Sequence, residues 1–290
     1  MTMTAAHDVQ TQARQLAGYA DASRLRQEHD RDWVLDRIPD APAALVDLGS
    51  GIGQLLDTAL DRFPTLTRAV GLERSPHRIA EARQRLARHG DRVALHPADL
   101  LRPPLLPLRA DAVTMTSVLH WLHPDEERIL AWVAEHLAPR GRFLLTTYHP
   151  DRDEDGFGGE DEIVRDALAS LGVRSAGVPG LFRAGAVLPI GTRTRTADDL
   201  RRLLERHFTV VGTHERDAVV TVDSAERYTH FHAATFGDYY GRLVEPARRT
   251  DFYRAVGESA VRRQEQRGHV SSMPVRLWEL GPADPSGRLL

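Results

Sequence analysis

The sequence predicts an α/β fold with a doubly wound, mostly parallel sheet, an antiparallel last strand and a helical lid. Between residues 44 and 147, short apolar runs alternate with segments whose apolar residues recur at helical spacing. A glycine-rich turn follows the first apolar run, as in sheets that bind ligands at the carboxyl ends of their strands. The chain after residue 150 is less regular until a final apolar run at 275–280, so we expect it to contribute the lid and the last strand.

The alternating part predicts five strands joined by helices. The strands are expected at residues 44–48, 69–73, 93–95, 112–116 and 143–147, and the helices at 54–63, 76–90 and 125–137. Ser75 followed by Pro76 is a typical cap and first residue of a helix. Right-handed crossovers would make these strands parallel.

We expect one domain over residues 1–290, built from several segments. These are a helical arm at 1–39, a core at 40–150, lid or substrate segments at 151–196 and 224–270, and the rest of the core sheet at 197–222 and 273–281. Within the later segments, Thr196-x-x-Asp199 predicts a capped helix, and residues 208–211 predict a strand. Residues 151–162 predict an acidic loop, and residues 224–236 and 246–266 predict helices.

The composition excludes several kinds of chemistry. The 290 residues include no cysteine, and all 38 basic residues are arginine, so thiolate sites, disulfides and Schiff-base lysines are absent. A formal net charge of −3 gives no reason to expect a nucleic-acid partner. The chain shows neither a signal peptide nor an apolar stretch of about 20 residues, so we expect a cytoplasmic protein without a membrane partner.

The glycine-rich turn Asp47-Leu-Gly49-Ser-Gly51-Ile-Gly53 is the strongest functional signal. Glycine lets a ligand approach the backbone closely, because no Cβ lies between them. A dinucleotide site would require the spacing G-x-G-x-x-G. The third glycine of that pattern would fall on Gln54 or Leu56, so both registers fail.

The turn instead resembles motif I of the class I, Rossmann-like methyltransferases that depend on S-adenosylmethionine (SAM). Three further segments match that family in order: Glu73 after the second strand, Asp99 after the third, and residues 116–121 after the fourth. The resemblance implies that Glu73 accepts hydrogen bonds from the ribose and that Asp99 lies near the adenine. It implies a SAM site, with S-adenosylhomocysteine as product, formed by Asp47, Gly49, Ser50, Gly51, Gly53, Glu73, Arg74, Asp99, Leu100, Thr116, Ser117 and Val118.

Leu119-His120-Trp121 is similar to small-molecule methyltransferases such as the trans-aconitate type. The Asn/Asp-Pro-Pro-Tyr signature of nucleic-acid amino methyltransferases is absent here. The resemblance therefore implies a small-molecule acceptor, with an acidic compound or a secondary metabolite among the alternatives, and leaves a homodimer open. The expected acceptor-side residues are Trp121, Tyr148, Tyr228, His232 and Tyr239.

His120 and His149 are the candidate general bases, because each follows a strand at the expected acceptor side and imidazole titrates near neutral pH. A carboxylate acceptor would need no base, whereas a hydroxyl, an amine or an acidic carbon would. Packing or solvent exposure is the alternative role for each histidine. Arg24 and Arg26 are weaker candidates for pairing with the methionine carboxylate or an acidic substrate.

Several alternatives stay open. His230 and His232 could serve a metal-assisted C- or O-methyltransferase, although positions two apart in a helix do not share a face. Residues 151–162 match the letters of an EF-hand calcium loop, but Pro150 and a strand lead into them instead of a helix. Our expectation is that no metal is bound. A SAM-binding regulator, a cyclase and, less favoured, a nicotinamide-dependent oxidoreductase are the remaining readings.

Overall fold

A computed structural model describes residues 31–283 of the chain. Residues 1–30 of the predicted helical arm at 1–39, with Arg24 and Arg26, lie outside the described residues. Residues 31–35 are helical and lead through a turn into the first strand. Among the described residues, no helix has both the length and the apolar character that a membrane span requires.

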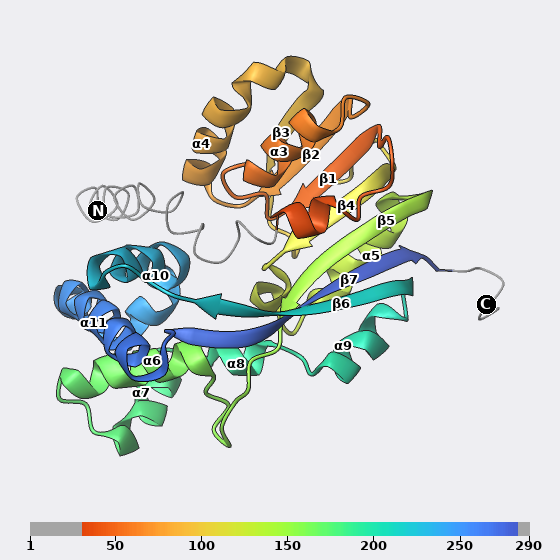
Figure 1. The fold of residues 1–290 in the computed structure, drawn as a ribbon. Coiled ribbons are helices and arrows are strands. Elements are labelled where there is room, and N and C mark those ends of the chain that lie inside the picture. Colours follow the sequence, from red (N-terminus) through yellow and green to blue (C-terminus); the bar gives the residue numbers. More distant parts are fainter. Residues whose placement is uncertain (1–30, 284–290) are drawn as a thin grey trace. The chain divides into compact units, whose positions relative to one another are not determined.

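A seven-stranded sheet forms the centre of the fold (Figure 1). Its order is β3-β2-β1-β4-β5-β7-β6. The strands are β1 (Ala44–Leu48), β2 (Arg68–Glu73), β3 (Val93–Pro97), β4 (Ala110–Thr116), β5 (Leu137–Tyr148), β6 (Phe208–Val220) and β7 (Ser271–Pro282). Strands β1 to β5 pair in parallel, and β7 pairs antiparallel with β5. The predicted doubly wound sheet with an antiparallel last strand is confirmed.

The crossover helices begin and end near the predicted residues. They are α3 (Gln54–Arg62), α4 (Pro76–Leu86), α5 (Glu126–His136) and, after the irregular part, α9 (Ala197–Leu204), with short 3-10 turns η1 (Ala87–Arg92) and η2 (Leu119–Leu122). The predicted caps are confirmed, because Ser75 Oγ accepts from the Arg78 amide and Thr196 Oγ1 accepts from the Asp199 amide.

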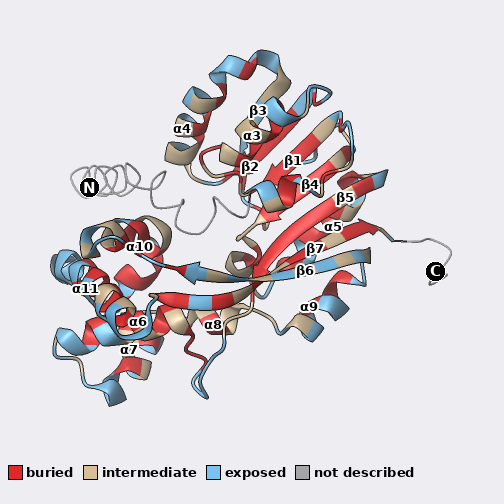
Figure 2. Ribbon diagram, in the orientation of Figure 1, coloured by how far each residue is buried: buried red, intermediate tan, exposed pale blue. Residues whose placement is uncertain are grey.

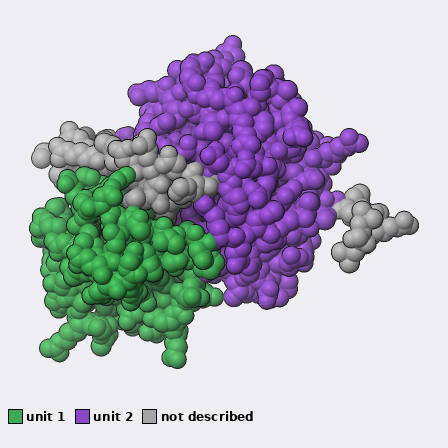
Figure 3. Space-filling model, in the orientation of Figure 1, with its two compact units in different colours: residues 1–29, 150–193, 217–274 green, residues 30–149, 194–216, 275–290 purple. Residues whose placement is uncertain are grey.

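The chain divides into two compact units, which Figure 3 colours separately. Unit 2 holds residues 30–149, 194–216 and 275–290, and unit 1 includes 150–193 and 217–274. The described part of unit 1 is mainly helical. Its helices are α6 (Gly159–Ser170), η3 (Ser175–Gly177), α7 (Val178–Ala184), α8 (Ile190–Arg193), α10 (Ala225–Tyr240), η4 (Gly241–Leu243), η5 (Pro246–Arg248) and α11 (Arg249–Arg267).

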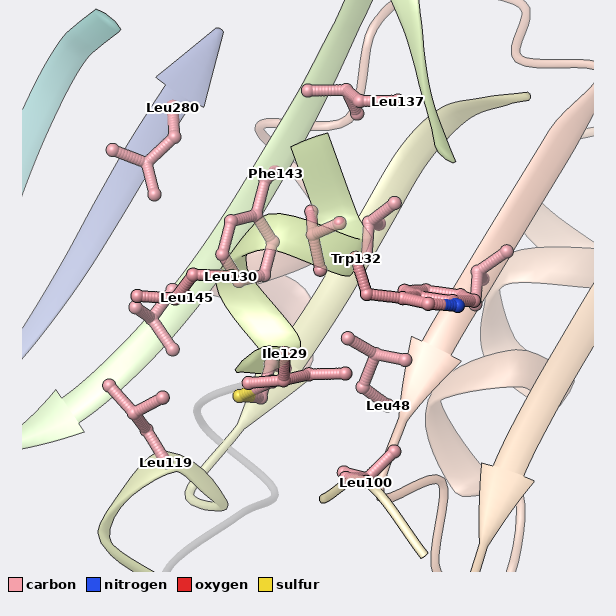
Figure 4. Packing of buried hydrophobic residues seen from close by; sticks show 14 of the residues in the cluster. Leu48, Leu100, Leu119, Ile129, Leu130, Trp132, Leu137, Phe143, Leu145 and Leu280 are labelled. Atoms are coloured by element: carbon pink, nitrogen blue, oxygen red, sulfur yellow. The ribbon is translucent and has the colours of Figure 1, made fainter. Parts of the chain in front are cut away.

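The central strands are buried along most of their length (Figure 2), and the buried residues are mainly apolar, as a parallel sheet between helices requires. Val46 and Leu48 of β1 belong to one buried cluster, which also contains Phe143 of β5 (Figure 4). Leu45, on the opposite face of β1, belongs to a second cluster with Leu56 of α3. The alternation along β1 therefore anchors helices on both sides and holds the carboxyl ends of the strands in place.

Three predicted boundaries were wrong. Strand β5 begins at Leu137 instead of 143, because Gly141 lets it approach β4 closely: a Cβ there would lie 2.8 Å from the Ala110 carbonyl oxygen. Helix α6 begins at Gly159, inside the predicted acidic loop, since Asp161 accepts from the Gly158 amide and caps it. Strand β6 continues to Val220, well beyond the predicted 208–211.

Candidate active site

The turn after β1 has a backbone that glycine adopts easily. Gly49, Gly51 and Gly53 have φ angles of 74°, 55° and 78°. A Cβ on Gly49 would lie 2.5 Å from Val118 Cγ2, and one on Gly53 would lie 2.8 Å from Leu86 Cδ1. A Cβ on Gly51 would meet no heavy atom of the described residues within 4 Å. Gly51 is thus the glycine whose backbone lies open to an approaching ligand.

Glu73, at the end of β2, holds the same turn. Its Oε2 accepts from the Gly51 amide at 3.0 Å, and its Oε1 accepts from the Ser75 amide at 2.8 Å. The Leu72 carbonyl accepts from the amides of Gly49 and Ser50, which fixes the turn against β2. A carboxylate oxygen can accept more than one hydrogen bond, so Glu73 retains capacity for hydroxyl donors. This acceptor beside an open glycine backbone fits the ribose of SAM.

Asp47 lies beneath the turn, buried, where its Oδ1 accepts from Thr114 Oγ1 of β4 at 2.7 Å. Burial raises the pKa of Asp47 to about 7; the Thr114 hydrogen bond opposes this, and the charge of Glu73 adds to it. The side chain that was predicted to bind SAM therefore pairs with a neighbouring strand and stabilises the junction of β1 and β4.

The third acidic residue follows β3. The Ala98 amide donates to the Glu73 carbonyl at 2.9 Å, which brings this segment beside the end of β2. Asp99 is exposed, and its Oδ1 accepts from the Leu101 amide at 3.0 Å. Leu100 is buried in the core, whereas Arg74 is exposed. Of these predicted cofactor residues, Asp99 presents a carboxylate to solvent and Leu100 anchors the segment.

A second turn, at residues 116–118, follows β4. Ser117 has a φ of 59°, one of three described non-glycine residues with a positive φ. Its amide donates to Thr146 Oγ1 at 3.0 Å, and its Oγ shares a hydrogen bond of 2.6 Å with the Tyr148 hydroxyl. Val118 fills the space above Gly49. The two turns that were predicted to bind SAM are therefore in direct contact.

The predicted acceptor-side residues of unit 2 lie together after β4 and β5. The His120 ring centroid lies 4.8 Å from that of Trp121 and 6.2 Å from that of Tyr148, edge to face in the second case. Tyr148 is buried, whereas His120 and Trp121 are half-buried. This cluster brings one imidazole beside the 116–118 turn.

His149 is held by protein partners at both ring nitrogens. Nδ1 lies 3.3 Å from the Arg195 carbonyl, which can only accept, so Nδ1 carries the proton. Thr147 Oγ1 accepts from Trp278 Nε1 and donates to His149 Nε2, at 2.9 Å in each case. Burial, together with the charge of Arg276, lowers the pKa of His149. This arrangement favours a neutral, structural imidazole and leaves His120 as the better candidate base.

A buried ion-pair network beside this histidine was not predicted. Glu126, 1% exposed, accepts from Arg195 Nε and Nη2 at 3.0 and 2.9 Å, and lies 2.8 Å from His123 Nδ1. Burial alone would raise the pKa of Glu126, but the hydrogen bonds from Arg195 and His123 lower it below its usual value. The sequence does not reveal this ion pair, because Glu126 and Arg195 are separated by 69 positions.

The predicted acceptor-side residues of unit 1 are buried. The Tyr228 hydroxyl donates to Glu160 Oε2 at 2.9 Å, and the His232 ring stacks on Tyr240 with centroids 5.4 Å apart. The Tyr239 hydroxyl donates to the Leu188 carbonyl. These contacts hold the helices of unit 1 together, and a role of Tyr228, His232 and Tyr239 toward the acceptor stays a prediction.

The two metal alternatives gain no support from the geometry. His230 is exposed and His232 is buried on a continuous helix, so the two imidazoles lie on different faces. Asp153 accepts from the amides of Asp155 and Phe157 and pairs with an arginine, and Glu162 belongs to α6. Within residues 31–283, no group of three or more histidine, aspartate or glutamate side chains could hold a metal ion.

Comparisons with known proteins identify a domain in the same part of the chain. The model of a methyltransferase domain family matches residues 46–143, which contain both turns. The chain is 37% identical over 146 residues to a trans-aconitate 2-methyltransferase of Methylobacterium nodulans, covering 49% of this chain and 51% of the relative. It is 32% identical to a 3-amino-4-hydroxybenzoate 4-O-methyltransferase of Streptomyces cremeus, covering 66% and 45%. The chain thus spans about half of the length of these curated relatives.

A solved structure shares the fold across most of both chains. It is a SAM-dependent methyltransferase from Thiobacillus denitrificans in complex with S-adenosylhomocysteine, with a TM-score of 0.55 and 14% identity, covering 89% of this chain and 92% of the other. At this identity the likeness shows the fold alone. The predicted methyltransferase domain is confirmed over residues 46–143.

Proposed function

Because the core of this chain is a methyltransferase domain of the class I, SAM-dependent family, we propose that the protein transfers a methyl group to an oxygen of a small molecule. The observation that carries the proposal is the junction of the two turns. There, Gly51 leaves the backbone open, Glu73 offers a buried carboxylate, and Ser117 and Val118 close the other side.

Different residues of unit 2 would bind different parts of SAM. SAM supplies an activated methyl group bound to a positively charged sulfur. The open backbone at Gly51 would admit the ligand, Glu73 would accept hydrogen bonds from its ribose hydroxyls, and Asp99 would lie on the adenine side. The backbone of residues 116–118 would border the methionine end. Since the reaction is an in-line displacement, the main task of the protein is to place the acceptor behind the methyl group and to exclude water.

The acceptor side supports oxygen as the attacked atom. The two relatives act, by name, on trans-aconitate and on a 4-hydroxyl of an aminohydroxybenzoate. A carboxylate acceptor is already a nucleophile. For a hydroxyl acceptor, His120 would take the proton, because it lies beside the 116–118 turn and is half-buried. A secondary-metabolic acceptor, a cytoplasmic location and a homodimer stay predictions.

The first experiment separates donor binding from transfer. We would titrate the protein with S-adenosylhomocysteine and with NADH by calorimetry. We expect micromolar binding of the first and none of the second, and Glu73→Ala should abolish the former. We would then incubate the protein with SAM and either trans-aconitate, 3-amino-4-hydroxybenzoate or related acids and phenols, and detect methylated product and S-adenosylhomocysteine by mass spectrometry.

Each outcome decides between the alternatives. Binding of NADH without S-adenosylhomocysteine would overturn the methyltransferase proposal and assign Glu73 to a dinucleotide site. S-adenosylhomocysteine bound, with no turnover of any acid or phenol, would favour a regulator or a cyclase that uses SAM without transferring its methyl group. Transfer to an amine or a carbon, with none to oxygen, would contradict the O-methyl assignment alone.

A further inference from the structure

We propose that Tyr148 is a positioning residue for the donor site: its hydroxyl holds Ser117 in a left-handed conformation that the turn needs to form the wall of the SAM site. This inference rests on the proposed function. It assigns to Tyr148 a role in donor binding that differs from the acceptor contact predicted from the sequence.

Ser117 has a backbone conformation that serine avoids. Its φ of 59° places it in the left-handed region, where the Cβ crowds the following carbonyl, so residues other than glycine seldom adopt it. Such a residue persists only where its surroundings hold it, and strained residues of this kind gather at functional sites. Something in the fold must therefore compensate for the strain at residue 117.

Two side chains of β5 provide the compensation. Thr146 and Tyr148 lie on one face of the strand, because side chains two positions apart point the same way. Thr146 Oγ1 accepts from the Ser117 amide at 3.0 Å, and the Tyr148 hydroxyl lies 2.6 Å from Ser117 Oγ. The pair holds both the backbone and the side chain of Ser117. Tyr148 is buried, so its hydroxyl is fixed by packing.

The conformation of Ser117 places Val118, the next residue, against the glycine turn. Val118 lies so close to Gly49 that any Cβ on that glycine would come within 2.5 Å of it. The backbone of 116–118 therefore lies directly across from the turn of residues 49–53. If Ser117 relaxed to a right-handed or extended conformation, Val118 would leave Gly49 and the wall of the site would shift.

Glycine at position 117 provides the decisive test. We would measure the Kd of S-adenosylhomocysteine by calorimetry for Tyr148→Phe, Ser117→Ala, Ser117→Gly and the double variant Tyr148→Phe/Ser117→Gly. Tyr148→Phe and Ser117→Ala each lose the hydroxyl pair but keep a Cβ in the left-handed region, so we expect binding about tenfold weaker. Ser117→Gly needs no compensation, and we expect both it and the double variant to bind within about twofold of the wild type.

The rescue by glycine distinguishes positioning from general damage. Tyr253→Phe is the matched control: it removes a buried tyrosine hydroxyl that donates to the Gly237 carbonyl in unit 1, and it should leave the Kd unchanged. If Tyr148→Phe proves unstable, the comparison of Ser117→Ala with Ser117→Gly still decides the question.

The results also separate this inference from the proposed function. A wild type that does not bind S-adenosylhomocysteine would refute the methyltransferase proposal itself. A wild type that binds, together with a Tyr148→Phe variant of unchanged Kd and a raised acceptor KM, would refute the positioning role and restore Tyr148 to the acceptor side. Weak binding by Tyr148→Phe that Ser117→Gly does not restore would also refute it.

Discussion

At the scale of single residues, the candidate site depends on backbone conformations more than on charged side chains. Gly49, Gly51 and Ser117 all have positive φ angles, yet their surroundings differ. Val118 lies against Gly49, whereas an added Cβ on Gly51 would meet no described atom within 4 Å. Ser117 is hydrogen-bonded to the Tyr148 hydroxyl. Substitutions at these positions should therefore separate the stability of the fold from the binding of a ligand.

Gly49→Ala and Gly51→Ala form a matched pair. Both place a Cβ at a positive φ, which costs about 1 kcal/mol or more. At Gly49 the methyl group would also overlap Val118, so we expect a further loss of about 1 to 3 kcal/mol. Gly51→Ala should keep most of its stability but weaken S-adenosylhomocysteine binding at least tenfold. Urea unfolding and calorimetry test both; equal loss of stability in the two variants would contradict the model of the turn.

The raised pKa of Asp47 predicts that the stability of the ligand-free protein depends on pH. Its pKa is raised to about 7 in the folded state, from an ordinary value of 3.8, so the folded state favours the protonated carboxyl. The corresponding stability is present below the unfolded pKa and is lost as the pH rises through about 7. A shift of this size corresponds to at most about 4 kcal/mol.

The measurement is the free energy of unfolding between pH 5 and pH 8. Asp47→Asn keeps an oxygen that accepts from Thr114 but cannot ionise, so its stability should decline less over this range than that of the wild type. Asp91→Asn, at an exposed position, should follow the wild-type profile. Parallel profiles for the wild type and Asp47→Asn would show that Asp47 does not titrate in this range.

The proposed role of His120 as a base predicts that its substitution lowers kcat for hydroxyl acceptors more than for carboxylate acceptors. With a hydroxyl acceptor, His120→Gln should lower kcat by about a hundredfold or more, because general base catalysis contributes about that much. With a carboxylate acceptor, the same variant should keep a kcat close to that of the wild type. His149→Gln is the comparison, since both nitrogens of His149 already contact Thr147 and Arg195. If His149→Gln alone lowered kcat, with an unchanged melting temperature, the base would have to be reassigned.

At the scale of elements, the end of β5 serves two purposes because its side chains alternate. Thr146 and Tyr148 contact Ser117, whereas Thr147 and His149 contact Trp278 and Arg195. One face of the strand thus supports the 116–118 turn, and the other contacts the segments in which the chain returns to unit 2. The buried pair of Glu126 and Arg195 strengthens this second contact.

Glu126→Gln should weaken that contact. Removing one partner of a buried ion pair leaves Arg195 without its counter-charge, and because Arg195 is 30% exposed we expect a loss of about 2 kcal/mol. The pKa of Glu126 is lowered, so its contribution to stability is present above the unfolded pKa of 4.5 and is lost as the pH falls through the lowered pKa of the folded state. Urea unfolding should therefore show a difference at pH 7 that narrows at pH 4.

Glu127→Gln is the control for this prediction. The neighbouring Glu127 is 53% exposed and pairs with Arg206 at 3.1 Å, so its loss should cost less than about 0.5 kcal/mol. If Glu126→Gln and Glu127→Gln lowered the free energy of unfolding by the same small amount, the Glu126 network would contribute no more to stability than a surface ion pair.

The same elements show what sequence reasoning can and cannot find. Local sequence patterns were sufficient to predict β1 to β4 and the capped helices. Ser75 and Thr196 are typical cap residues, and the glycine-rich turn marks the end of a strand. They failed where a distant segment decides the structure. The early start of β5 depends on how Gly141 meets β4, and the start of α6 depends on Asp161, whose carboxylate also accepts from the amides of α8.

The candidate site divides in the same way. The order of Gly51, Glu73 and Asp99 along a strand-helix repeat was sufficient to predict a donor site from the sequence. By contrast, the pairing of Thr114 with Asp47 and the position of Arg195 depend on contacts between residues far apart in the chain. No local pattern reports such contacts, so the role of Asp47 and the network of Glu126 required the structure.

At the scale of the whole molecule, the division into two units predicts two stages of protection from hydrogen exchange. S-adenosylhomocysteine alone should slow exchange in unit 2, at residues 49–53, 73–75 and 116–118, because bound ligand stabilises the segments that contact it. A productive acceptor added afterwards should slow exchange in α6 and α10 of unit 1 if the helical segments act as a lid. Protection of unit 2 alone in both states would contradict the lid.

The order of the strands bears on how the protein is made. Strand β7 follows β6 in the chain, yet it lies between β5 and β6 in the sheet. During translation, β6 leaves the ribosome more than fifty residues before the strand that joins it to the rest of the sheet. Until then, β5 and β6 present unpaired edges of the kind that attract other chains. A nascent chain stalled before Ser271 should therefore be a substrate for chaperones, and its sheet can close only once β7 has been synthesised.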